Sequence, residues 1–85
     1  MTNYDNAISA VLSEIERAKA KWPGWPEDIV HGAAVVAEEA GELVQASLDA
    51  AYSGGSVDRA IEEAIHAAAT AIRFISETKR DNAPV

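Results

Sequence analysis

With 85 residues, 14 of them acidic, 7 basic and none cysteine, the chain has room for a single domain and carries a net charge of −7. This charge disfavours binding to the phosphate backbone of a nucleic acid, and the lack of cysteine excludes disulfides and thiolate metal sites. No apolar run approaches the ~20 residues that span a bilayer, and the first residues lack the basic and apolar stretches of a secretion signal. We therefore expect one cytoplasmic domain over residues 1–85, with no nucleic-acid or membrane partner.

The first predicted helix covers residues 4–21, and Asn3 is its candidate N-cap. Its apolar side chains recur at the three- and four-residue spacing of a single helix face. They are Ile8, Val11, Leu12, Ile15 and Ala18. A connector over residues 22–28 follows, and its two prolines and one glycine cannot continue a helix.

The second predicted helix begins at Pro26 or at the two acidic residues behind it, and it runs to about Tyr52. Residues 53–55, Ser-Gly-Gly, end it and form a short loop. A loop this short favours an antiparallel hairpin with the helix that follows.

The third predicted helix has Ser56 as its N-cap and runs to about Lys79. Residues 80–85 are predicted to form a frayed tail. Strand-like alternation is absent, and the two Ala-rich helices have strong helix propensity. The fold class is therefore predicted to be all-α, a bundle of three main helices.

Two neighbouring rows of side chains distinguish the second helix. One is a central apolar stripe, predicted to face the core, of Ile29, Ala33, Val36, Ala40, Leu43, Ser47 and Ala51. The other is a flank of Gly32, Val35, Glu39, Glu42, Ala46 and Ala50. Glu39 and Glu42 lie one turn apart on this otherwise small or apolar flank. Buried carboxylates are costly unless they are paired or bound to a metal, so this pair is a candidate metal site.

The third helix has the complementary pattern. Its predicted core stripe comprises Val57, Ile61, Ala64, Ile65, Ala68, Ile72 and Ile75. A continuous polar row comprises Arg59, Glu63, His66, Thr70, Arg73 and Glu77. Glu63 and His66 are three residues apart in this row, which is the spacing of paired ligands on a bundle helix.

An antiparallel hairpin brings the acidic flank of the second helix opposite the polar row of the third, at comparable heights along the two helices. Glu39, Glu42, Glu63 and His66 are therefore candidate ligands of a hard cation such as Mg²⁺, which prefers oxygen donors. The alternative for both rows is an ordinary solvated face, because every amphipathic helix has a polar side.

The stretch Glu38-Glu39-Ala40-Gly41-Glu42 resembles the EExxE motif of MazG-like nucleotide pyrophosphohydrolases. In that family an ExxD motif follows on the next helix, and residues 63–66, Glu-Ala-Ile-His, occupy its place here. The segment Trp25-Pro26-Glu27-Asp28 also resembles the tryptophan-containing entry to the family's motif helix. The resemblance covers about residues 22–75.

This resemblance implies an all-α protein that forms a homodimer or a dimer of dimers. It implies Mg²⁺-dependent hydrolysis of (deoxy)nucleoside triphosphates to the monophosphate and pyrophosphate, with Mn²⁺ as a possible substitute. Glu39, Glu42 and Glu63 would then be metal ligands, and Glu38 would orient the attacking water as a catalytic residue.

His66 departs from the family pattern, because aspartate is expected at its position. A neutral imidazole prefers softer metals than Mg²⁺. Two roles remain open: His66 is itself a ligand, or it stands behind the metal and hydrogen-bonds a ligating glutamate or the substrate's phosphate. Arg73 and Trp25 are candidate substrate-binding residues, with a solvated arginine and a loop-anchoring tryptophan as the alternatives.

Apolar side chains on the second helix extend beyond its central stripe, at Val30, Val35, Val44 and Leu48. A domain of this size buries only a modest core, so association with further copies is expected. The second functional hypothesis is accordingly a non-catalytic helical interaction module, whose oligomer is its function.

Overall fold

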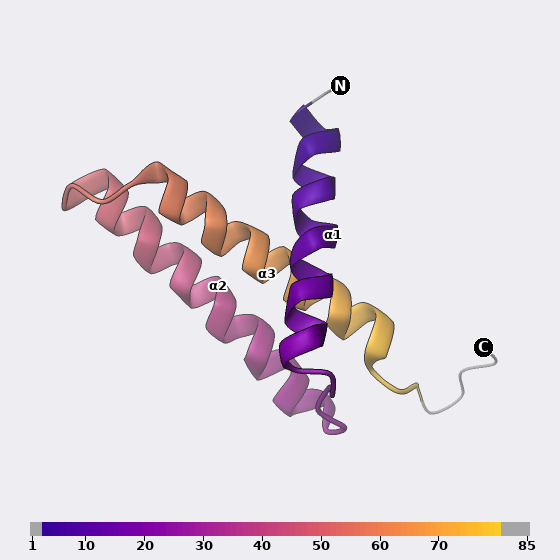
Figure 1. Cartoon of the computed structure of the whole chain (residues 1–85). Coiled ribbons are helices and arrows are strands. Elements are labelled where there is room, and N and C mark those ends of the chain that lie inside the picture. Colours follow the sequence, from indigo (N-terminus) through magenta and orange to yellow (C-terminus); the bar gives the residue numbers. More distant parts are fainter. Residues whose placement is uncertain (1–2, 81–85) are drawn as a thin grey trace.

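The computed structural model describes residues 3–80 and contains three α-helices, α1 (Asn3–Lys21), α2 (Ile29–Tyr52) and α3 (Val57–Glu77). No strand is present within this range, which confirms the predicted all-α class. Figure 1 shows α2 and α3 as an antiparallel hairpin, with α1 lying across α3. Most of the expected C-terminal tail, residues 81–85, lies outside the described residues.

The ends of the helices follow from local capping. Asp28 is the N-cap of α2, and its side chain accepts hydrogen bonds from the backbone N–H groups of Val30 and His31, each at 3.3 Å. The acidic pair rather than Pro26 therefore starts this helix. Ser56 caps α3, as predicted, by accepting a bond of 3.0 Å from the Asp58 N–H. Asn3 is the first helical residue of α1 instead of its cap.

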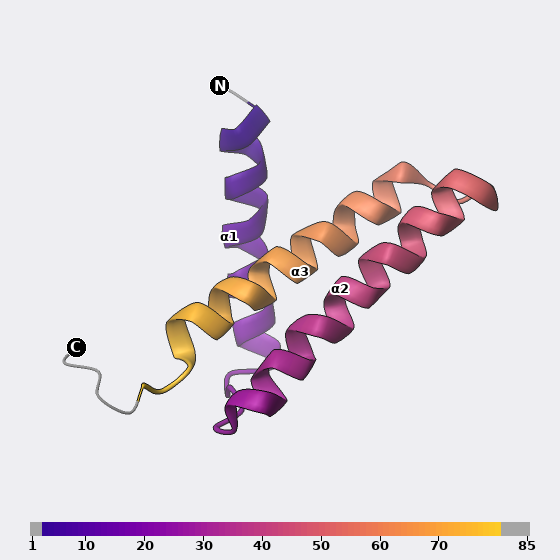
Figure 2. The ribbon, with the colours of Figure 1, turned by 180° about the vertical axis from the view of Figure 1, so that it is seen from behind.

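The hairpin turn includes Gly54, whose backbone has a positive φ of 76°. Only glycine adopts this conformation at little cost, which explains why α2 ends there. Both α1 and α2 pack against α3, whereas α1 and α2 do not pack against each other. Figure 2 shows from behind that the N-terminal half of α1 projects away from the hairpin.

The face of α2 that packs against α3 is the flank, not the predicted central stripe. Gly32 and Ala46 are its buried residues. A Cβ atom on Gly32 would lie 3.2 Å from Trp25 Nε1 and 3.4 Å from the Phe74 ring, so the absence of a side chain permits this close approach. The predicted stripe is largely exposed, with Val36 and Leu43 half-buried.

The prediction for α3 is wrong in the same sense. Its polar row faces the other helices: Glu63 and Arg73 are buried, with exposed fractions of 5% and 6%, and His66, Thr70 and Glu77 are half-buried. The large side chains of its apolar stripe are mainly exposed, at Val57, Ile61, Ile72 and Ile75. Periodicity shows that a helix has two faces, but it does not show which face the rest of the same chain covers.

None of the helices within residues 3–80 combines the length and the apolar character needed to cross a membrane.

Candidate metal centre

Helix α3 contributes a buried carboxylate with two partners on its own helix. The His66 Nδ1 atom lies 3.1 Å from Glu63 Oε1, within hydrogen-bonding distance. Arg59 donates from Nε and Nη2 to Glu63 Oε2, each at 3.2 Å. A carboxylate that is removed from water needs such compensation, and both oxygens of Glu63 have it.

Helix α2 contributes a carboxylate without such compensation. The Oε2 atom of Glu39 is buried and accepts no hydrogen bond from the described residues. Burial raises the pKa of Glu39, and the negative charges of Glu42, Glu63 and Glu38 raise it further, against an opposing effect of His66. Loss of water and nearby like charges both disfavour the ionised form, so a cation placed here would relieve both.

One ligand atom each from Glu39, Glu63 and His66 lies within 4.8 Å of the others. The donor set is two carboxylates and one imidazole, held by facing helices. Two glutamates suit Mg²⁺, which keeps several waters, and the imidazole extends the range to Mn²⁺. The residues therefore fit a divalent cation, on the evidence of the buried and unpartnered Glu39 oxygen.

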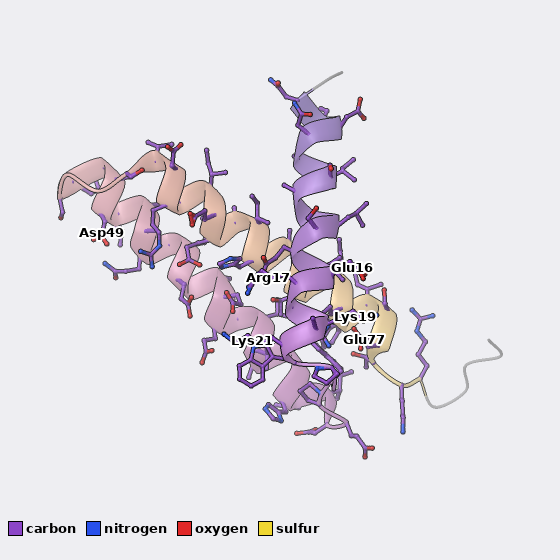
Figure 3. The ribbon with its side chains drawn as sticks, in the orientation of Figure 1. Glu16, Arg17, Lys19, Lys21, Asp49 and Glu77 are labelled. Atoms are coloured by element: carbon purple, nitrogen blue, oxygen red, sulfur yellow. The ribbon has the colours of Figure 1, made fainter. Side chains whose placement is uncertain are left out.

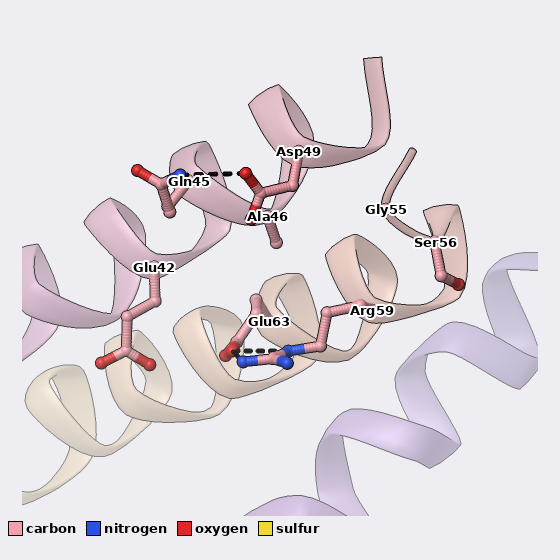
Figure 4. Close-up of a pocket in the computed structure, with 8 residues that line it drawn as sticks. All are labelled: Glu42, Gln45, Ala46, Asp49, Gly55, Ser56, Arg59 and Glu63. Atoms are coloured by element: carbon pink, nitrogen blue, oxygen red, sulfur yellow. Dashed lines mark hydrogen bonds and ion pairs between the residues drawn. The ribbon is translucent and has the colours of Figure 1, made fainter. Parts of the chain in front are cut away.

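Glu42, the fourth predicted ligand, is not part of this group. It is exposed and lines a neighbouring cavity of about 410 Å³ that extends toward the hairpin turn, together with Arg59 and Glu63. Figure 4 shows its carboxylate on α2, beside the Arg59–Glu63 pair on α3. Glu42 acts on the group mainly through its charge, which contributes to the raised pKa of Glu39.

Two residues of α1 that the sequence did not single out lie beside the group. Glu14 Oε2 is 3.8 Å from His66 Nε2, and Glu14 also binds Arg17 through contacts of 2.6 and 2.8 Å. The hydrogen bond from Arg17 lowers the pKa of Glu14. Their three-residue spacing indicates an ion pair, but nothing in the sequence shows that α1 crosses α3 at His66.

A second cavity, of about 440 Å³, lies between α1, the connector and the metal candidates. Glu38, Glu39 and His66 line it from the hairpin, and Arg17 and Trp25 line it from α1 and the connector. Figure 3 shows Arg17 on α1 near the crossing with the hairpin. The exposed Glu38 therefore lines the same cavity as Glu39.

The predicted substrate residues Arg73 and Trp25 contact each other, and their contacts join the connector to α3. Arg73 donates from Nε to Glu77 Oε2 at 2.8 Å and from Nη2 to the Gly24 carbonyl at 3.1 Å. Its guanidinium carbon lies 5.3 Å from the centroid of the Trp25 ring. Arg73 is buried, so the solvated alternative is wrong, and its contacts hold the connector against α3.

Comparison of the chain with known protein families, curated proteins and solved structures finds no match.

Proposed function

We propose that the protein is a metal-dependent hydrolase that cleaves (deoxy)nucleoside triphosphates to the monophosphate and pyrophosphate. The observation that carries this proposal is the buried, unpartnered oxygen of Glu39 beside Glu63 and His66. The resemblance of residues 38–42 to the EExxE motif gives the reaction, and the adjoining cavity gives a place for a substrate next to the group. Glu39 and Glu63 are the proposed ligands of Mg²⁺ or Mn²⁺.

A bound divalent ion would neutralise charge on the phosphate oxygens of the substrate. The remaining roles belong to side chains around the cavity. Glu38 is exposed there and is the candidate for orienting a water molecule and accepting its proton. Both arginines have carboxylate partners, but Arg17, on the opposite wall, is exposed whereas Arg73 is buried, so Arg17 is the better candidate for a phosphate contact.

His66 is proposed as a positioning residue for Glu63 and not as the third ligand. Its Nδ1 atom already faces Glu63 Oε1 at 3.1 Å, which is the arrangement in which a histidine fixes the orientation of a ligating carboxylate. Its Nε2 atom faces Glu14 at 3.8 Å. His66 therefore links the α1 ion pair to the proposed ligand on α3.

The test is a screen for pyrophosphate release from common and modified nucleoside triphosphates with Mg²⁺ and with Mn²⁺. Release should require the metal and should be lost in Glu39→Gln and in Glu63→Gln. Glu62→Gln is the matched control, because Glu62 is the exposed neighbour of Glu63 on the same helix. Absence of metal-dependent release across the screen would count against the enzyme.

The second candidate function, a helical interaction module, is favoured by the exposed apolar stripe of α3. Within the described residues the buried hydrophobic residues are Ala46 and Ala69, whereas Val57, Ile61 and Ile75 of the stripe are each more than half exposed. A single chain therefore leaves most of this apolar surface in water, which costs about 25 cal/mol per Å².

We propose a second copy of the chain as the partner on this stripe. The exposed side chains are large and aliphatic, as in obligate homodimers, whose interfaces resemble a domain core. Sedimentation equilibrium at micromolar concentration should give a dimer or a dimer of dimers. A dimer with no metal response would favour the interaction module, and a dimer that releases pyrophosphate would favour the enzyme.

A further inference from the structure

Arg59 occupies a distinctive place beside the proposed metal ligands. Its side chain is 67% exposed, yet two of its nitrogens contact a single oxygen of the buried Glu63. Arginine usually pairs with carboxylates through both oxygens, and here His66 faces the other one. The exposed Arg59 cation therefore offsets the negative charge of Glu63 from the side of Oε2 alone.

The surroundings of Arg59 are otherwise acidic. The cavity of about 410 Å³ beside it is lined by Glu42, Asp49 and Glu63, and Arg59 is the only basic residue among those that line it in the described part of the chain. Figure 4 shows the guanidinium lying along the Glu63 carboxylate, with Glu42 across the cavity. Its positive charge is thus placed where it offsets acidic side chains of both α2 and α3.

We propose that Arg59 is an internal counter-cation, which competes with the divalent metal for Glu63 and so sets the metal affinity of the site. The inference rests on the proposed metal site. In the metal-free chain, the Arg59 charge stabilises the buried Glu63 carboxylate in place of a metal. With a metal held by Glu39 and Glu63, the Arg59 guanidinium would be a like charge close to the ion, and its contacts with Glu63 would compete with metal binding.

The opposite role would be positioning, in which Arg59 holds Glu63 ready for the metal and increases affinity. The two roles predict effects of opposite sign. At a separation of about 5 Å in a largely aqueous environment, repulsion between a guanidinium and a divalent ion corresponds to on the order of tenfold in affinity. Because Arg59 is exposed, this effect should weaken at high salt.

Titration of the full chain with Mn²⁺, followed by calorimetry, tests the sign. Arg59→Gln should bind Mn²⁺ about three- to tenfold more tightly than wild type at low ionic strength, and the difference should shrink in 0.5 M salt. Arg59→Lys keeps the charge but loses the planar fork, so its affinity should stay close to wild type. Far-UV circular dichroism verifies that each variant keeps its helices.

Lys79→Gln is the matched control, because it removes the same charge from an exposed residue whose ion-pair partner is Glu27, outside the cluster. Its Mn²⁺ affinity should equal that of wild type. If wild type binds Mn²⁺ but Arg59→Gln binds it equally or more weakly, the proposed role of Arg59 is wrong and the metal site stands. If neither protein binds Mn²⁺, the metal site itself is wrong, and the role of Arg59 falls with it.

Discussion

The two rows of α3 occupy environments opposite to those expected from their chemistry. The polar row, with Glu63 and Arg73, contains the buried charged residues of the helix, and most of the large side chains of the apolar row, with Ile61 and Ile75, are exposed. A helix whose polar row packs inside its own chain has partners there for its charges, as Arg59 and His66 are for Glu63. The exposed apolar side chains have no such cover within the described residues, and they are the basis for proposing a second copy of the chain as the partner. The first row carries the proposed site, and the second carries the proposed assembly.

The largest expected effect is on the apolar row. Ile61→Glu should shift the proposed dimer to monomer at micromolar concentration, because an unpaired charge in a desolvated interface costs several kcal/mol and raises the dissociation constant by about a hundredfold or more. Ser13→Glu on α1 is the control, since it adds the same charge at an exposed polar position. Sedimentation equilibrium measures both, and equal association of Ile61→Glu and wild type would show that this row is not the interface.

The next largest effect is expected for Glu39, which lies on α2 opposite the polar row of α3, and it concerns the stability that metal binding adds. At a hundredfold excess of metal over its dissociation constant, binding contributes roughly 2.7 kcal/mol to stability, and Glu39→Gln should lose most of this. Thermal melting with and without Mn²⁺ measures the loss. A variant that keeps the full metal-induced shift would exclude Glu39 as a ligand.

Glu39 also predicts a pH dependence of the metal-free protein. Because its folded pKa is raised, mainly by burial, the folded state binds the proton more tightly than the unfolded state does. The stability conferred by protonated Glu39 is present at low pH and is lost as the pH rises from its ordinary value of 4.5 through the raised one. In melts with a chelator, Glu39→Gln should therefore gain stability relative to wild type as the pH increases. A difference that is constant from pH 4 to 8 would contradict this.

A smaller effect is expected at His66. If it orients Glu63, His66→Ala should weaken Mn²⁺ binding by about 10–100-fold without abolishing it, whereas a direct ligand should cost more. A shift of preference toward Mg²⁺ over Mn²⁺ in His66→Asp is expected only if the side chain at position 66 bonds the ion directly, because a carboxylate is the harder donor, so the positioning role predicts no such shift. Calorimetric titrations with both metals provide the measurement. Unchanged affinity in His66→Ala would remove His66 from the site.

The three helices and the cap at Ser56 could be predicted from the sequence, because periodicity, proline, glycine and capping residues act locally. For α2 the sequence left Pro26 and the acidic pair open, and the structure selects Asp28 of that pair as the cap. The meeting of Glu39, Glu63 and His66 also followed, since a short loop fixes the hairpin register. The position of Glu14 and Arg17 of α1 beside His66 could not be predicted from the sequence, because the crossing of α1 and α3 depends on contacts between residues far apart in the chain.

The orientation of both hairpin helices was missed for a different physical reason. Apolar rows were expected to meet inside the chain, whereas small residues at Gly32 and Ala46 let α2 approach the polar side of α3 closely. Hydrophobic patterns identify the surfaces that should be removed from water, but a second copy can cover them as well as the chain itself. The exposed position of Glu42 is a separate error, since it belongs to the flank that packs against α3 and its side chain is nevertheless exposed beside the neighbouring cavity.

The smallest expected effects are changes in the free energy of unfolding when each of the two glycines of α2, one on each face, is replaced by alanine. Gly41 lies within the EExxE-like segment on the exposed face, and a Cβ atom there would meet nothing within 4 Å. Gly41→Ala should therefore raise the free energy of unfolding by about 0.5–1 kcal/mol, because alanine has the higher helix propensity.

A Cβ on Gly32 would lie 3.2 Å from Trp25 Nε1, and Arg73 stacks on that ring while bonding the Gly24 carbonyl next to it. The connector cannot easily yield, so Gly32→Ala should be less stable than Gly41→Ala by about 1 kcal/mol or more, and less stable than wild type. Urea unfolding curves of the three proteins at one chain concentration measure both differences. Equal stabilisation by the two alanines would mean that α2 is not packed against the connector and α3 as the structure describes.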